Sequence, residues 1–125
     1  NPTPDSQSPT GVYIPVDLLD CFYELNKMIP TSLRKQIQDS SETDLSQHHF
    51  DLCMWMRNNW GLWSSESRLK QYFAGIGVFH ADSISSLILS SYWRYLNGKP
   101  LDLPRQIVYD KIMRDEIESG TEPLN

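Results

Sequence analysis

The run Trp55-Met56-Arg57-Asn58-Asn59-Trp60-Gly61-Leu62-Trp63 lies at the centre of the aromatic-rich part of this chain. Upstream of Gly61, apolar residues recur at helical spacing through Leu45, Leu52 and Met56, which predicts a helix over residues 44–59. Further apolar residues between positions 50 and 54 widen this stripe beyond that of a surface helix, so we expect a central element. Gly61 is placed to end the helix in the left-handed conformation that glycine readily adopts.

Helical spacing covers most of the remaining chain. It predicts six spans, at residues 14–29, 31–38, 44–59, 69–76, 82–96 and 104–117. In the span 82–96, serines alternate with apolar residues, and small side chains allow a neighbouring helix to approach closely, so we expect this span to be the second central element. Because no stretch alternates with a period of two, the sequence predicts an all-α fold, a single compact bundle-like domain of five to six helices.

The two ends of the chain differ in composition from its middle. Residues 1–13 are rich in Pro and Ser and lack apolar periodicity, which predicts a flexible N-terminal leader before a helical domain at 14–118 and a C-terminal tail at 119–125. A leader that begins with Asn1 rather than Met is typical of a processed or trimmed chain. We expect an exported protein, periplasmic or lipid-anchored after signal removal, with a cytoplasmic protein as the alternative.

The composition excludes several classes of protein. A chain of 125 residues with 39% hydrophobic residues can bury a core without a disulfide framework or a metal. The net charge of -5 argues against nucleic acid as a partner, and no apolar stretch approaches the ~20 residues that cross a bilayer, so we expect no transmembrane segment. Acidic residues dominate positions 1–54 and 110–125 and flank a basic middle, which indicates solvated faces or an acidic surface that meets a basic partner.

The sequence offers weak signals for chemistry. Ser67 and Lys70 match a Ser-x-x-Lys pattern, but the other motifs of acyl enzymes are missing, so Ser67 is expected to start a helix. His49 and Cys53 are four residues apart without a second ligand pair. Cys21 and Cys53 are expected to be buried thiols, with a single bridge as the alternative. We therefore assign no catalytic residue, no metal site and no cofactor.

Ten of the fourteen aromatic residues lie between Phe50 and Tyr95, so we expect a binding site in this region. Trp and Arg are the residues that most often dominate the energy of protein interfaces. The candidate binding patch consists of Arg57, Asn58, Asn59, Trp60, Trp63, His80 and Asp82. In the alternative interpretation, Arg57 and the two asparagines lock a tight corner after the helix, while Asp82 caps the next long helix and His80 fixes the turn before it.

A wider set of residues carries a family resemblance. The run from Met56 to Trp63 is followed by Ser67-Arg68-Leu69, by Tyr72-Phe73, and by Gly77, His80, Asp82, Ser85-Ser86, Ile88-Leu89, Tyr92 and Leu96-Asn97. Over residues 14–107 the chain resembles a family of small bacterial domains of unknown function, marked by an Arg-Asn-Asn-Trp-Gly-Leu-Trp motif. Members usually place a proline, two acidic residues and a methionine after the histidine, where this chain has Ala81-Asp82-Ser83-Ile84. The resemblance implies a compact helical domain, in many relatives behind an export signal, and no activity.

Three functions fit these observations. The first is a non-enzymatic protein-interaction module, inhibitor or immunity-like, whose partner is another protein. The second is a small-ligand-binding or enzymatic domain with a pocket near Trp60, Trp63 and His80. The third is a structural accessory domain of an exported protein. The oligomeric state is left open.

Overall fold

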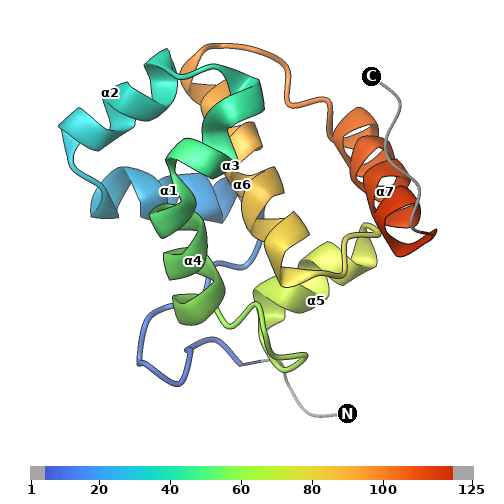
Figure 1. Cartoon of the computed structure of the whole chain (residues 1–125). Helices are drawn as coiled ribbons and strands as arrows, with labels where there is room; N and C mark the ends of the chain where they lie inside the picture. The colour runs from blue at the N-terminus through green and yellow to red at the C-terminus, as the bar shows by residue number, and fades with distance from the viewer. Residues whose placement is uncertain (1–4, 120–125) are drawn as a thin grey trace.

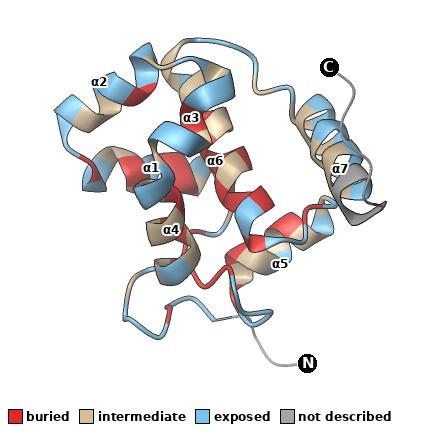
Figure 2. Ribbon diagram, viewed as in Figure 1, coloured by how far each residue is buried: buried red, intermediate tan, exposed pale blue. Residues whose placement is uncertain are grey.

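The chain folds around one buried helix, α6 (Ala81–Leu96), which lies among the other helices (Figure 1). The computed structural model describes residues 5–119. Nine of the sixteen residues of α6 are buried, and Ile88 and Leu89 are completely inaccessible (Figure 2). Burying an aliphatic side chain of this size contributes about 1.5–3 kcal/mol to the free energy of unfolding, so α6 anchors the hydrophobic core.

Within residues 5–119 the chain forms seven α-helices and one 3-10 helix. In chain order they are α1 (Leu18–Met28), α2 (Thr31–Asp39), η1 (Glu42–Asp44), α3 (Leu45–His48), α4 (Phe50–Asn59), α5 (Arg68–Gly75), α6 (Ala81–Leu96) and α7 (Leu103–Ser119). The described residues form no strand, only two isolated β-bridges. The expected all-α class is therefore confirmed.

The expected number of five to six helices is slightly too low, because the span 44–59 is not one helix. The backbone of His49 leaves the helical region, with φ -120° and ψ 36°, and separates α3 from α4. The His49 ring lies 3.1 Å from the Ser40 hydroxyl in the preceding loop, so a side-chain contact accompanies the break. Despite this break, α3 and α4 make the most extensive contacts with α6, as expected for the two central spans.

Two side chains close the first turns of their helices. The Asp17 carboxylate accepts a hydrogen bond from the Asp20 amide at 2.9 Å and caps α1. Ser67 is buried, and its hydroxyl accepts from the Lys70 amide at the start of α5 while donating to the Trp60 carbonyl at 2.9 Å. Ser67 is thus a helix cap that also binds the end of α4, as its position before a predicted helix indicates.

Asp5 pairs through its backbone with the start of α5. The Asp5 amide donates to the Glu66 carbonyl at 2.6 Å, and the Asp5 carbonyl accepts from the Arg68 amide at 3.2 Å. The Arg68 guanidinium in turn donates to the Ile14 carbonyl at 2.7 Å. The division into leader, domain and tail stays a prediction, and residues 1–4 and 120–125 lie outside the described residues.

The last helix, α7, lies at the edge of the molecule (Figure 1). None of its residues from 103 to 115 is buried, although Leu103 and Ile107 pack against the core. Among the described residues, no helix combines the length and the apolar character needed to cross a membrane.

The corner after α4 requires a glycine for two reasons, which can be separated by experiment. Gly61 has φ +67°, and a Cβ atom there would lie 3.0 Å from the Ser67 Cβ. Gly98 has nearly the same φ, +66°, with no atom within 4 Å of its Cβ position. We expect Gly98→Ala to lower the free energy of unfolding by about 1 kcal/mol, from backbone strain alone, and Gly61→Ala by about 2–4 kcal/mol, because steric overlap adds to the strain.

Urea denaturation of both variants and the unsubstituted chain measures this difference. Equal losses in the two variants would show that close packing at Gly61 contributes nothing.

Candidate functional site

The seven candidate residues occupy two places in the fold. Arg57, Asn58 and Asn59 are the last residues of α4, and Trp60 and Trp63 lie in the turn that follows. His80 and Asp82 lie at the start of α6. The sequence alone joins them into one patch, whereas the structure divides them into a corner and a helix start.

The two tryptophans of the corner have opposite environments. Trp60 is 1% exposed, and its ring meets Trp55 edge-on with centroids 5.7 Å apart, so it belongs to the core. Trp63 is 61% exposed, and its indole Nε1 donates to the Asn58 Oδ1 at 2.9 Å. Only Trp63 is therefore available to a partner.

Arg57 connects the corner to the central helix. Its Nε donates to the Ser85 Oγ of α6 at 2.9 Å, and the Ser85 hydroxyl donates to the Asp82 carbonyl at 3.0 Å. The guanidinium also lies over the Phe50 ring, 5.6 Å from its centroid. This half-buried cation therefore has a structural role and still contacts an exposed aromatic ring.

Asn58 and Asn59 have different tasks. Asn58 is exposed and holds Trp63. Asn59 donates to the Trp55 carbonyl at 3.0 Å and accepts from the Thr10 hydroxyl at 3.0 Å, so it closes the end of α4 and binds the N-terminal segment. The interpretation that these residues lock the corner fits Asn59 best.

Asp82 does not cap α6, although the sequence predicts that it does. His80, not Asp82, is the N-cap residue of α6, and its side chain makes no capping hydrogen bond. The Asp82 carboxylate accepts from the Ser83 amide at 3.0 Å and forms an ion pair with Arg114 of α7. Partial burial raises the pKa of Asp82, but the hydrogen bond and charge of Arg114 outweigh this effect, so its pKa lies below the ordinary value.

The Trp63 corner, which we define as Arg57, Asn58 and Trp63, is the part of the predicted patch that the structure holds together. Asn58 follows Arg57 in the helix, and the Arg57 carbonyl accepts from the Leu62 amide at 3.1 Å, next to Trp63. Asn59 and Trp60 contribute to the packing of the corner, whereas His80 and Asp82 lie at the start of α6, where Asp82 pairs with Arg114.

A groove between α6 and α7 was missed by the sequence analysis. It encloses about 490 Å³ and is lined by residues from η1, α3, α6 and α7: Glu42, Thr43, Ser46, Ser83, Ser86, Leu87, Ser90, Arg94, Arg105, Gln106, Tyr109 and Asp110. Its α6 wall contains three serines at spacings of three and four residues. This spacing was the available signal, but small residues at helical spacing indicate close packing as readily as a groove.

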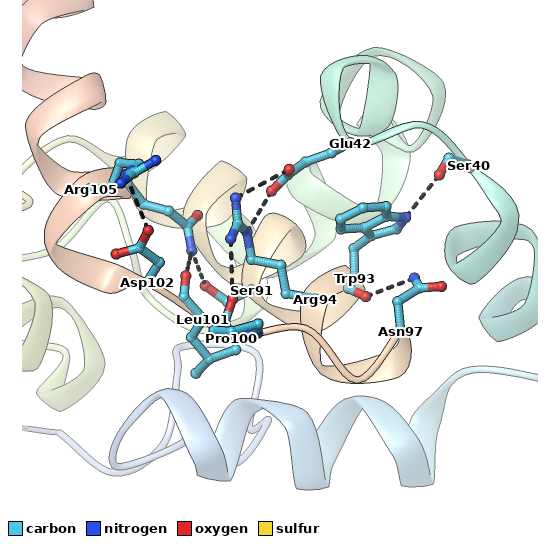
Figure 3. A network of polar contacts seen from close by, with 11 residues as sticks. Ser40, Glu42, Ser91, Trp93, Arg94, Asn97, Pro100, Leu101, Asp102 and Arg105 are labelled. Atoms are coloured by element: carbon cyan, nitrogen blue, oxygen red, sulfur yellow. Dashed lines mark hydrogen bonds and ion pairs between the residues drawn. The ribbon is translucent and has the colours of Figure 1, made fainter.

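Polar contacts fix one end of this groove (Figure 3). Arg94 forms a two-point ion pair with Glu42, at 2.7 and 3.2 Å, and donates to the Pro100 carbonyl at 3.1 Å. Gln106 donates to the Ser91 hydroxyl at 3.1 Å and to the Leu101 carbonyl at 2.8 Å. The segment that leads to α7 is therefore bound to α6 at its beginning.

The residues weighed for metal or thiol chemistry lie elsewhere. Cys21 and Cys53 are both buried as free thiols, and burial raises the pKa of each. Within the described residues no three His, Cys, Asp or Glu side chains are grouped as metal ligands. A second pocket, of about 430 Å³, lies beside His48 and His49, and none of the seven candidate residues lines either pocket.

Comparison with known proteins places the chain in a family. Residues 14–96 match the family DUF6794, described as a domain of unknown function. The chain belongs to this family. No curated protein and no solved structure matches it. The expected membership in a family of domains of unknown function is confirmed. Bacterial origin and the marker motif stay predictions. The DUF6794 match contains the Trp63 corner and ends before α7.

The ion pair between Asp82 and Arg114 should make the free energy of unfolding depend on pH in the acid range. A carboxylate whose pKa is lowered by folding adds stability above its ordinary pKa, and this stability is lost as the pH falls through the lowered value. Because the pair with Arg114 is partly exposed, we expect Asp82→Asn to reduce the free energy of unfolding at neutral pH by at most about 1 kcal/mol. The difference from the unsubstituted DUF6794 domain should shrink as the pH falls and disappear once Asp82 is protonated in the folded state.

Asp51→Asn is the matched control, because Asp51 also lies in the first turn of its helix and Arg114 is not its partner. Urea denaturation between neutral and acid pH measures both variants. An equal pH dependence in the two would show that Arg114 is not the cause.

Proposed function

We propose that this domain is a non-enzymatic protein-interaction module, inhibitor or immunity-like, that binds another protein through the Trp63 corner. The observation that carries the proposal is the state of Trp63, which is largely exposed while its indole nitrogen is hydrogen-bonded to Asn58. A large apolar ring held in solvent is available as an anchor for a partner.

The hydrogen bond to Asn58 favours binding in two ways. It satisfies the indole N-H, so a partner can cover the ring without burying an unpaired donor. It also restricts the orientation of the side chain before the partner arrives, which reduces the entropy lost on binding. A preorganised tryptophan of this kind is typical of residues that dominate interface energy.

Two further side chains of α4 are accessible to a partner. Phe50 is exposed at the start of α4, and the Arg57 guanidinium covers its ring face. The bond from Arg57 to Ser85 of α6 keeps this cation in place. Arg57 and Phe50 therefore add a charged and an aromatic contact on the helix that holds Asn58.

The net charge of the chain acts at long range. A charge of -5 attracts a basic protein and raises the rate of encounter more than the final affinity. The Trp63 corner lies in the basic middle of the sequence and contributes the cation Arg57, so the net charge does not define the charge of the partner at this corner. Export of the protein remains a separate prediction.

The small-ligand alternative has less support at the predicted place. Trp60 is buried, and neither pocket is lined by Trp60, Trp63 or His80. The groove between α6 and α7 lies at other residues and is the place where a ligand search would begin.

Substitution of Trp63 tests the proposal. Partners are captured from extracts of the source cell on the immobilised domain, and the affinity of each captured protein is then measured by calorimetry. We expect Trp63→Ala to weaken the specific partner by at least about thirtyfold, because loss of an interface anchor costs about 2 kcal/mol or more. Asn58→Ala should produce a smaller loss, because the ring stays but its orientation is freed.

Tyr23→Ala is the matched control, since Tyr23 of α1 is also 61% exposed. It should leave binding unchanged. A partner bound equally well by the Trp63→Ala variant, or weakened equally by Tyr23→Ala, would refute the Trp63 corner as the binding site.

A further inference from the structure

The outward face of α7 has an ordered pattern of residues. Arg105, Val108, Ile112 and Asp115 are all exposed and follow one another at spacings of three, four and three residues. Residues with this spacing lie on one stripe of a helix. The stripe has a basic residue at one end, two aliphatic residues in the middle and an acidic residue at the other end.

The opposite face of α7 holds the helix against the domain. Near its beginning Gln106 donates to Ser91, and further along the Arg114 Nε donates to the Ser83 hydroxyl at 3.0 Å. Ile107 packs against the core between these two contacts. The orientation of α7 about its own axis is therefore fixed. Val108, Ile112 and Asp115 are exposed on the side away from these contacts, and Arg105 lies at the rim of the groove with its side chain 85% exposed.

The middle of the stripe is apolar. Val108 is 56% exposed and Ile112 51%, and their spacing of four residues makes them neighbours on the helix surface. Tyr109, which is 65% exposed, lies beside them at the groove that it helps to line. A contiguous apolar patch with charged ends is typical of an interaction surface.

We propose that this stripe is a dimerisation surface, on which α7 pairs in antiparallel orientation with α7 of a second copy of the chain. A two-fold axis midway between Val108 and Ile112 places Val108 opposite Ile112 of the partner subunit. The same axis places Arg105 opposite Asp115 of the partner subunit, and each contact occurs twice. The two-fold axis thus pairs apolar residues with apolar residues and opposite charges with each other, so the stripe is complementary to itself.

The order of charges along the stripe favours a second copy of the chain as the partner and an antiparallel orientation of the two helices. A parallel pair would place Arg105 opposite the partner's Arg105, so like charges disfavour it. Arg105 has an ion pair with Asp102 at 3.2 Å, but its side chain is 85% exposed, and an exposed pair of this kind is worth little. It does not prevent Arg105 from contacting a second copy.

The size of the contact between the two α7 helices indicates how strongly the dimer should associate. A helix of 17 residues is about 26 Å long, so a two-helix contact falls at the small end of specific interfaces. We expect a reversible dimer with a dissociation constant in the micromolar range.

Sedimentation velocity over a roughly hundredfold range of concentration around this value measures the equilibrium. The full chain should change from monomer to dimer, and Ile112→Lys should weaken the dimer at least about tenfold, because a buried aliphatic contact is replaced by a charge. Leu19→Lys is the matched control, since Leu19 of α1 is also exposed, and it should dimerise like the unsubstituted chain. Circular dichroism and thermal denaturation should show unchanged folding in both variants.

Charge reversal tests the pairing itself. Arg105→Asp alone places two acidic residues opposite each other, and Asp115→Arg alone places two basic residues opposite each other, so each variant should dimerise more weakly than the unsubstituted chain. Mixing the two variants should restore the dimer, because both contacts of the mixed pair are then complementary.

A chain that stays monomeric at the highest concentration overturns the proposal. So does a dimer that tolerates Ile112→Lys, or two charge-reversed variants that fail to associate when mixed. Association of α7 with a different protein, lost in Ile112→Lys while the chain alone stays monomeric, would assign the stripe to another partner and also overturn the proposal.

Discussion

The structure depends on satisfying the hydroxyl groups of its central helix. Ser83, Ser85 and Ser91 are buried in α6, where a hydroxyl without a partner would cost about 1–3 kcal/mol. Each accepts a hydrogen bond from a long side chain of another helix: Ser85 from Arg57 of α4, Ser91 from Gln106 of α7 and Ser83 from Arg114 of α7. These three bonds attach α4 and α7 to α6 in addition to the apolar contacts of the core.

This constraint also explains why the two proposed surfaces are well defined. Arg57 is held by Ser85, next to the asparagine that orients Trp63. Arg114 and Gln106 are held by Ser83 and Ser91, so Val108 and Ile112 of α7 remain exposed. Polar groups that point inward thus determine which side chains remain exposed. The family match includes the first surface and ends before the second, so the two can differ between relatives.

Local rules predicted much of the fold. Apolar periodicity located the helices, glycine marked the end of α4 at Gly61, and Ser67 marked the start of α5. The break at His49 could not be predicted, because the apolar stripe continues through it and its ring contacts a loop nine residues earlier.

For the site, composition identified the aromatic corner but could not tell buried Trp60 from exposed Trp63, since that difference depends on which helix covers the turn. The contact of Asp82 with Arg114 links residues far apart in the chain and has no local signal.

The two buried thiols have a practical consequence for studying this molecule. Cys21 and Cys53 are inaccessible, and their raised pKa values leave little of the reactive thiolate at neutral pH. An alkylating reagent can therefore modify them only when the surrounding helices separate. Cys21 lies in α1 and Cys53 in α4, so the labelling rate of each reports how often its own helix opens. The unsubstituted chain thus contains two reporters of local opening, without an added probe.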